Sequence, residues 1–152
     1  MCGGIVMRKI KFRGFDLDVK RWFYGSYHKH IKRQVCPMND SLKDTDIQHI
    51  IVFDGFADWN MEIPLKIANN IDINSVGEFT GLHDKQGKEI YEGDIVILNF
   101  TYGTFKCVIE YKDCHFEVSD LKNDSLRWFL HPSFELEIIG NIYENPEMLL
   151  NK

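Results

Sequence analysis

Three carboxylates, Glu89, Glu92 and Asp94, lie within six residues of each other. Carboxylate oxygens bind Mg²⁺ and Mn²⁺, so this spacing could serve a metal-dependent hydrolase or nuclease. However, Glu92 and Asp94 flank Gly93 at a predicted turn, whereas Glu89 precedes a strand, so the spacing does not require all three to converge on one ion. The other interpretation is a solvated acidic turn, because motifs this short often match by chance. We therefore predict no catalytic residue and no metal ligand here, and keep the hydrolase as an alternative.

Histidine and cysteine residues suggest two further kinds of chemistry. His28 and His30 lie on the same face of an extended segment, and with Cys36 they could bind zinc. A closed zinc site needs a fourth ligand, and the neighbouring sequence supplies none. Cys114 and His115 are adjacent, which places them on opposite faces of a strand and disfavours a thiolate–imidazolium dyad. No glycine-rich phosphate loop or Gly-x-Ser-x-Gly motif occurs. We expect a protein that is not an enzyme and uses no cofactor.

A basic segment rich in aromatic residues offers a different function. Residues 8–33 contain nine Lys and Arg and two acidic residues, a local charge of +7, in a protein whose net charge is -5. Basic residues interleaved with aromatic rings are typical of sites that hold single-stranded nucleic acid. In the plainer interpretation the rings face the core, while the cations are solvated or pair with the acidic part of a neighbouring subunit. The residues predicted to contact nucleic acid or a protein partner are Lys9, Lys11, Arg13, Lys20, Arg21, Trp22, Lys32 and Arg33.

The elements that must carry these residues are predicted to be strands. Within residues 8–33, Ile10 and Phe12 alternate with Lys9, Lys11 and Arg13, which predicts a strand with one apolar face, a break at 14–18 and a second strand from 21 onwards. The β-branched run 47–53 predicts another strand. Residues 65–69 follow a proline and are expected to form a turn or two of helix, and 59–63 could extend a strand. The middle segment, 34–76, is the least regular.

The second half of the chain has a clearer pattern. Short apolar or alternating runs at 95–98, 105–111, 115–118 and 136–143 are spaced about ten residues apart, which favours a small bent sheet or barrel. Gly81, Gly87 and Gly93 are expected at turns where a Cβ would be costly. Asp94 can bond the backbone at the entry to a strand. These four residues form a predicted structural turn motif.

Composition limits the classes of protein that remain. The 152 residues, 44% of them hydrophobic, suffice for one domain or two small lobes. No apolar run approaches the roughly 18 residues of a membrane span, so we expect no membrane partner. We expect no signal peptide at the N-terminus, and we therefore expect the four cysteines to be reduced thiols in a cytoplasm. We predict an N-terminal extension at 1–6, an N-terminal β lobe at 7–76 with a variable middle, and a C-terminal lobe at 77–150.

Three blocks of sequence carry a family resemblance. They are RKIKFRGFD at 8–16, FTGLHDKQGKEIYEGDIV at 79–96 and IIGNIYENP at 138–146. In this order and spacing the chain resembles the YopX family of bacteriophages and prophages. The resemblance implies a mainly β protein with little helix: an N-terminal β-hairpin or small sheet and a small C-terminal SH3-like barrel. It implies no activity and no catalytic residue.

These observations favour a non-catalytic phage or prophage accessory protein in the cytoplasm of a bacterial host. We expect a small β binding module that contacts another macromolecule or itself. The split between +7 in residues 8–33 and -12 in the remainder favours head-to-tail homo-oligomers. The second hypothesis is nucleic-acid binding by residues 8–33, which we call the basic aromatic ribbon. The third is the metal-dependent hydrolase. No small-molecule substrate is evident.

Overall fold

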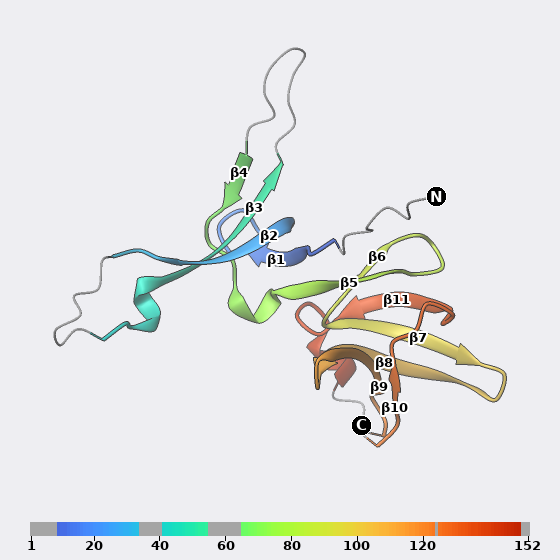
Figure 1. The fold of residues 1–152 in the computed structure, drawn as a ribbon. Coiled ribbons are helices and arrows are strands. Elements are labelled where there is room, and N and C mark those ends of the chain that lie inside the picture. Colours follow the sequence, from blue (N-terminus) through green and yellow to red (C-terminus); the bar gives the residue numbers. More distant parts are fainter. Residues whose placement is uncertain (1–8, 34–40, 55–64, 124, 150–152) are drawn as a thin grey trace, which may run out of the picture. The chain divides into compact units, whose positions relative to one another are not determined.

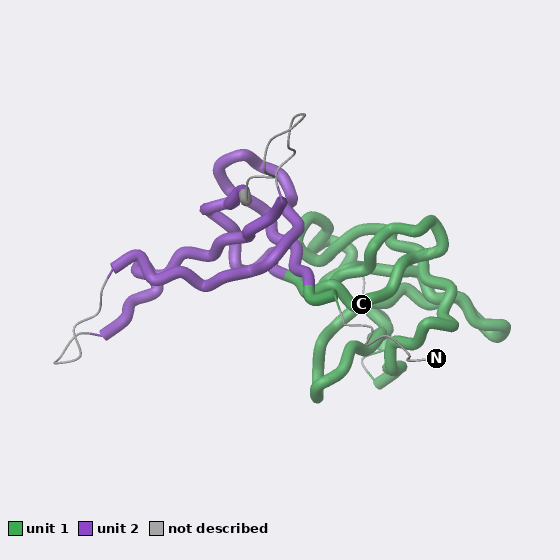
Figure 2. Tube along the Cα trace, turned by 45° about the horizontal axis from the view of Figure 1, so that its top comes forward, with its two compact units in different colours: residues 1–10, 77–152 green, residues 11–76 purple. Residues whose placement is uncertain are grey.

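The chain is organised as two compact units built almost entirely of β-strands (Figure 2). Unit 1 consists of Met1–Ile10 and Gly77–Lys152, and unit 2 consists of Lys11–Val76. The computed structural model describes residues 9–33, 41–54, 65–123 and 125–149. Helix in this part is limited to three short 3-10 turns, η1 (Asp44–Asp46), η2 (Ile73–Ser75) and η3 (Pro146–Leu149). The predicted mainly β fold is confirmed. None of the described helices is long and apolar enough to cross a membrane.

Unit 2 contains four antiparallel strands whose neighbours in the sheet are also neighbours in sequence (Figure 1). Their order is β4-β3-β2-β1, and β2 is the longest of the four, with 11 residues. The turn between β1 and β2 is fixed by Asp16, whose carboxylate accepts the backbone N–H groups of Asp18 and Val19 at 2.9 and 3.1 Å. The strands are β1 (Phe12–Asp16), β2 (Arg21–Ile31), β3 (Ile47–Asp54) and β4 (Leu65–Ala68).

The core of unit 2 is small. Its buried members are Phe23, Ile51, Ala68 and Ile71. Gly14 lies against this core, because a Cβ there would stand 2.5 Å from Cγ2 of Ile71 and 2.9 Å from Cδ1 of Ile51. The absence of a side chain in the middle of β1 therefore lets two isoleucines fill the space beside the strand.

Two local predictions, for residues 10–18 and for residues 65–69, are wrong in part. β1 extends to Asp16, so the break expected at 14–18 lies at 17–20. Arg13 is 7% exposed and Ile10 is 65% exposed, the reverse of the predicted faces. Arg13 is buried because its guanidinium lies over the ring of Trp22, 5.0 Å from the centroid, so a cation occupies a packed position.

Residues 65–68 form β4 and not a helix, since Ala68 pairs with Ile51 and joins the core. Cross-strand packing overrides the local helix propensity here. Residues 34–40 and 55–64 lie outside the described part.

Unit 1 contains the hairpin β5–β6 followed by a five-stranded antiparallel sheet (Figure 1). The sheet has the order β10-β9-β8-β7-β11: four consecutive strands lie side by side, and the last strand returns to pair with β7. Asp113 and Cys114 have φ of 48° and 66°, as the two-residue turn between β8 and β9 requires. The strands are β5 (Gly77–His83), β6 (Glu89–Tyr91), β7 (Asp94–Phe100), β8 (Gly103–Lys112), β9 (His115–Asp120), β10 (Arg127–Phe129) and β11 (Leu136–Asn141).

The core of unit 1 draws on the alternate residues of these strands. Ile90 from β6 and Leu136 from β11 meet the inward side chains of β7, β8 and β9. A smaller apolar cluster, Ile95, Val108 and Leu121, lies under the C-terminal turn η3, whose Met148 and Leu149 pack against it. The main cluster consists of Ile90, Val96, Leu98, Cys107, Ile109, Val118 and Leu136.

The glycine and aspartate turn motif shapes the entry to this sheet. Gly81, Gly87 and Gly93 have φ of +90°, +83° and +80°. Gly81 lies within β5, where the pairing with β6 shifts register, so it forms a bulge and not a turn. Asp94 is 2% exposed and its Oδ2 accepts the backbone N–H of Tyr91 at 2.8 Å, which fixes the turn before β7.

Asp84 connects the turn between β5 and β6 to the closing strand. Its Oδ1 accepts the backbone N–H groups of Gln86 and Lys88 at 2.8 and 2.9 Å, and its Oδ2 lies 3.4 Å from the N–H of Ile138 in β11. Burial on its own would raise the pKa of Asp84, but these three backbone hydrogen bonds outweigh it and hold the pKa below the usual value.

The two kinds of glycine in unit 1 predict different costs of substitution. A Cβ at Gly77 would overlap the backbone carbonyl of Glu92, whereas a Cβ at Gly87 would meet no heavy atom within 4 Å and suffer only from the positive φ. Gly77→Ala should therefore reduce the free energy of unfolding by about 3 kcal/mol, and Gly87→Ala by roughly 1 kcal/mol. Denaturant unfolding followed by circular dichroism measures both, and equal losses would contradict this packing.

The lowered pKa of Asp84 predicts how the stability of the protein changes with pH. A lowered pKa stabilises the fold above the unfolded value of about 3.9, and that contribution disappears as the pH falls through the folded pKa. Asp84→Asn should therefore destabilise the protein near neutral pH, and its difference from the wild type should shrink below about pH 4. Denaturation midpoints across this range test the claim. A difference that stays constant with pH would show that the ionised carboxylate is not the stabilising group.

Candidate functional site

The residues predicted to contact nucleic acid or a protein partner are divided between the two units. Several of their cations lie over rings of unit 2, which makes them part of its packing. Lys11 lies 5.4 Å from the ring centroid of Tyr24 and Arg21 lies 4.7 Å from that of Phe23, while Arg13 covers Trp22. Because residues alternate between the faces of a strand, Arg21 and Trp22 are presented to opposite faces of β2.

The remaining members of this set are scattered. Lys20 is in the β1–β2 turn with φ of 54°, and Lys32 is exposed just beyond β2. Arg33 forms an ion pair with Asp46 at 2.9 Å; its hydrogen bond, together with one from the Lys43 backbone, lowers the pKa of Asp46. Lys9 belongs to unit 1, where its Nζ is 3.8 Å from Glu89.

The two compact units do not carry the opposite charges that residues 8–33 and the remainder of the chain carry. Unit 2 has nine basic and nine acidic residues, while unit 1 has nine basic and fourteen acidic residues. The acidic residues of the middle segment thus share a unit with the basic ribbon. The +7 of residues 8–33 and the -12 of the remainder therefore do not fall on separate units. The charge distribution gives little support to head-to-tail association.

Two of the acidic residues considered for metal binding, Glu89 and Asp94, accept hydrogen bonds from Tyr91. Oε2 of Glu89 accepts the hydroxyl of Tyr91 at 2.6 Å, and Asp94 faces the backbone of the same residue. Burial raises the pKa of Glu92. Across the described ranges, no group of three or more His, Cys, Asp and Glu is arranged to hold a metal ion.

The described residues considered for zinc binding and for a thiolate–imidazolium dyad lie on β2 and at the β8–β9 turn. His28 and His30 are both exposed on β2, and Cys36 lies outside the described residues. Cys114 is exposed at the β8–β9 turn, while Nδ1 of His115 lies 3.1 Å from the backbone oxygen of Asp113. Cys107 is buried, and burial together with the charge of Asp120 raises its pKa to about 12, so its thiol is protonated at neutral pH.

A cluster of aromatic rings in unit 1 forms the strongest candidate for a binding surface. Phe100 is at its centre, with its ring centroid 5.0 Å from that of Tyr102, 5.5 Å from that of Trp128 and 5.6 Å from that of Phe134. Phe105 contacts Trp128 at 5.2 Å. Tyr102 is 70% exposed, and the other four rings are only half-buried. We call Phe100, Tyr102, Phe105, Trp128 and Phe134 the aromatic platform.

The platform follows from the topology of the sheet. Phe100 ends β7 and pairs with Gly103 across the tight turn, which brings Tyr102 and Phe105 beside it. Trp128 comes from β10, which pairs with β9, and its ring lies 5.5 Å from that of Phe100 and 5.2 Å from that of Phe105. The inner edges of Phe100, Phe105, Trp128 and Phe134 pack against the main core of unit 1. The platform was not predicted from the sequence, although the aromatic residues at 100, 102 and 105 are a visible signal.

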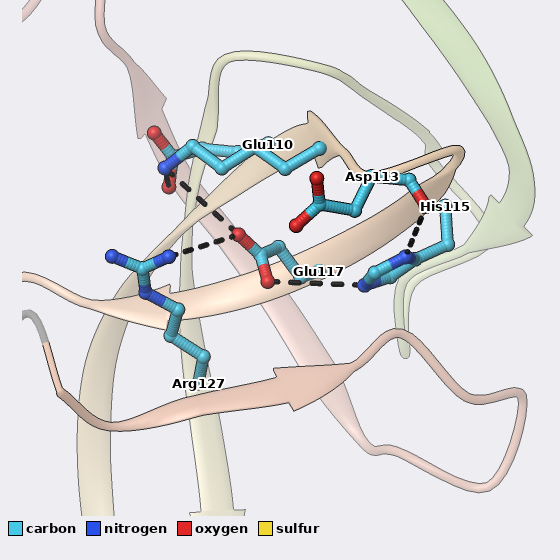
Figure 3. Close-up of polar contacts among 6 residues, drawn as sticks. Glu110, Asp113, His115, Glu117 and Arg127 are labelled. Atoms are coloured by element: carbon cyan, nitrogen blue, oxygen red, sulfur yellow. Dashed lines mark hydrogen bonds and ion pairs between the residues drawn. The ribbon is translucent and has the colours of Figure 1, made fainter.

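A second feature is a buried carboxylate on the outer face of β8, β9 and β10 (Figure 3). Glu117 is 8% exposed, and its Oε1 lies 3.7 Å from Nη1 of Arg127 and 3.9 Å from Nζ of Lys112. Its Oε2 lies 3.8 Å from Nε2 of His115. The same Lys112 donates a hydrogen bond to Glu110 at 2.8 Å. Of these residues only His115 was considered as a functional candidate from the sequence, because the cross-strand register that brings the others to it is not local.

Comparisons with known proteins support the predicted family. No curated protein matches the chain. Among solved structures, the chain is similar to the crystal structure of protein EF1440 from Enterococcus faecalis, with 23% identity, covering 93% of this chain and 98% of that chain at a TM-score of 0.45. The sequence profile of the family described as YopX protein matches residues 11–150, nearly the whole chain. The chain therefore belongs to the YopX family.

Proposed function

We propose that the protein is a non-catalytic binding module that contacts a protein partner through the aromatic platform. The observation that carries the proposal is the exposure of Tyr102 on four further rings that are themselves only half-buried. Aromatic side chains are enriched at protein interfaces, and a contiguous apolar surface on a small unit usually marks a contact site.

The mechanism is binding to a preorganised surface. Each ring of the platform is held by ring contacts between 5.0 and 6.0 Å, and four of them rest on the core, so a partner needs to order few side chains when it docks. Low ordering cost increases the share of the contact energy that appears as affinity.

The finer description of the protein is part of the same proposal. The order β10-β9-β8-β7-β11, in which the last strand returns to the first of four consecutive strands, supports an SH3-like barrel in unit 1. Membership of the YopX family supports an origin in a phage or prophage and action in the bacterial cytoplasm. The engagement of Glu89 and Asp94 with Tyr91 supports a structural and not a catalytic role for these carboxylates.

Tyr102→Ala should remove the partner with little effect on folding, because the side chain is mostly exposed. We expect at least about a tenfold loss of retained partner in affinity capture from bacterial lysate, as for an aromatic residue central to an interface. Tyr111→Ala is the matched control, since Tyr111 is 46% exposed near the opposite end of β8. The control should retain the partner fully.

The same capture distinguishes the other hypotheses. Retention that disappears on nuclease treatment and at high salt would indicate nucleic-acid binding and contradict the proposal. A partner that Tyr102→Ala and Tyr111→Ala retain equally would move the contact away from the platform. Light scattering of the eluted material shows whether the partner is a second copy of the chain.

A further inference from the structure

Unit 1 contains a pocket that shares one ring, Phe105, with the aromatic platform. The pocket has a volume of about 360 Å³. Lys106 of β8 pairs with Ile97 of β7, and the backbone N–H of Leu121 donates to the carbonyl of Lys106 at 2.9 Å, so these residues lie side by side. Because Phe105 lines the pocket and also packs within the platform, the two are contiguous at this ring. A partner that covers the platform therefore lies next to the pocket.

The pocket combines aliphatic walls with two lysines. Ile97 of β7, Leu121 and Met148 of η3 supply apolar surface. Lys106 and Lys122 line the same pocket and supply two ammonium groups. A side chain that enters the pocket therefore needs a short aliphatic stem to contact the walls and an end group that suits a cation.

The ammonium groups of these two lysines are available to a partner. Among the residues that the structure describes, neither Lys106 nor Lys122 has an ion-pair or hydrogen-bond partner for its side chain. Lys85 and Lys112 of the same unit, by contrast, hold carboxylates at 2.6 and 2.8 Å. The remaining charged residue of the pocket, Asp120, is only 6% exposed and presents little surface to a ligand. The accessible charge of the pocket is therefore positive, which favours an anionic group.

The charge of the whole unit favours a protein carboxylate over a nucleic acid as this anion. Single-stranded nucleic acid also stacks on aromatic rings, but it carries a phosphate at every nucleotide and binds along a basic groove. Unit 1 has nine basic and fourteen acidic residues, so beyond the two lysines it repels a continuous polyanion. One acidic side chain needs only the local pair of lysines.

We propose that the partner docks through a segment in which an acidic residue neighbours an apolar one. The apolar side chain lies on the aromatic platform, while the acidic side chain enters the pocket and its carboxylate accepts hydrogen bonds from Lys106 and Lys122. Because the platform and the pocket meet at Phe105, adjacent residues of the segment reach both. This inference rests on the proposed function and adds the chemistry of the partner to it.

The test is an NMR titration of the full ¹⁵N-labelled chain with three capped dipeptides, acetyl-Phe-Glu-amide, acetyl-Phe-Gln-amide and acetyl-Phe-Lys-amide. The glutamate peptide should shift the signals of residues 102–106 and Lys122 saturably. At low ionic strength it should bind about threefold more tightly than the glutamine peptide, as expected for a partly exposed ion pair, and the difference should shrink at high salt. The lysine peptide should bind most weakly.

Three results of this titration would overturn the inference. The first is no saturable shift with the glutamate peptide, and the second is equal affinity for the glutamate and glutamine peptides. The third is an octamer of deoxythymidine that shifts the same signals at lower concentration than the glutamate peptide, because it would assign the surface to nucleic acid.

Variants separate the pocket from the platform. Lys106→Gln and Lys122→Gln should each reduce the preference for glutamate over glutamine and leave the affinity for the glutamine peptide unchanged. Lys85→Gln is the control, since it removes the same charge but Lys85 pairs with Glu137 at 2.6 Å and does not line the pocket. A preference that survives in both pocket variants would overturn the inference. Tyr102→Ala should weaken all three peptides, and if it weakens none, the proposed function itself fails.

Discussion

The carboxylate of Asp84 joins the β5–β6 turn to the closing strand β11. It accepts two hydrogen bonds inside the turn and one from Ile138, while the neighbouring Lys85 N–H donates to the carbonyl of Leu136 at 2.9 Å. These bonds bring Ile90 and Leu136 into one core with β7, β8 and β9. A buried anion is tolerated here because backbone donors replace the water that it loses. The hydrogen bonds of Asp84 and Lys85 therefore hold β11 against the turn of the β5–β6 hairpin.

The packing of these strands determines which side chains remain available for contacts with other molecules. The inner face of β7, β8 and β9 is filled by the core, so the rings at the end of that core can cover it only in part, and they form the aromatic platform. On the outer face, η3 covers Ile95, Val108 and Leu121 but leaves a pocket beside Leu121, lined by Lys106 and Lys122. Both candidate sites therefore arise where the core or its cover ends. Neither depends on the basic ribbon of unit 2.

The sequence predicts the fold better than it predicts the sites. The mainly β class and the strands at 47–53 and 95–98 follow from local pattern, and the family follows from three sequence blocks. The helix expected at 65–69 and the apolar face expected for 10–12 fail, because cross-strand pairing to Ile51 and ring packing of Arg13 are non-local. The sites escape prediction for the same reason. Trp128 joins Phe105, and Arg127 joins Glu117, only through strand order.

The central claim is that partners bind unit 1 at the aromatic platform and not at the basic aromatic ribbon of β1 and β2. Hydrogen exchange of the full chain, alone and with its captured partner, tests this most directly, because backbone amides report burial segment by segment. If the partner binds at the aromatic platform, exchange slows in residues 99–105 and 128–134 and stays unchanged in residues 12–33. Protection confined to residues 12–33 would contradict it.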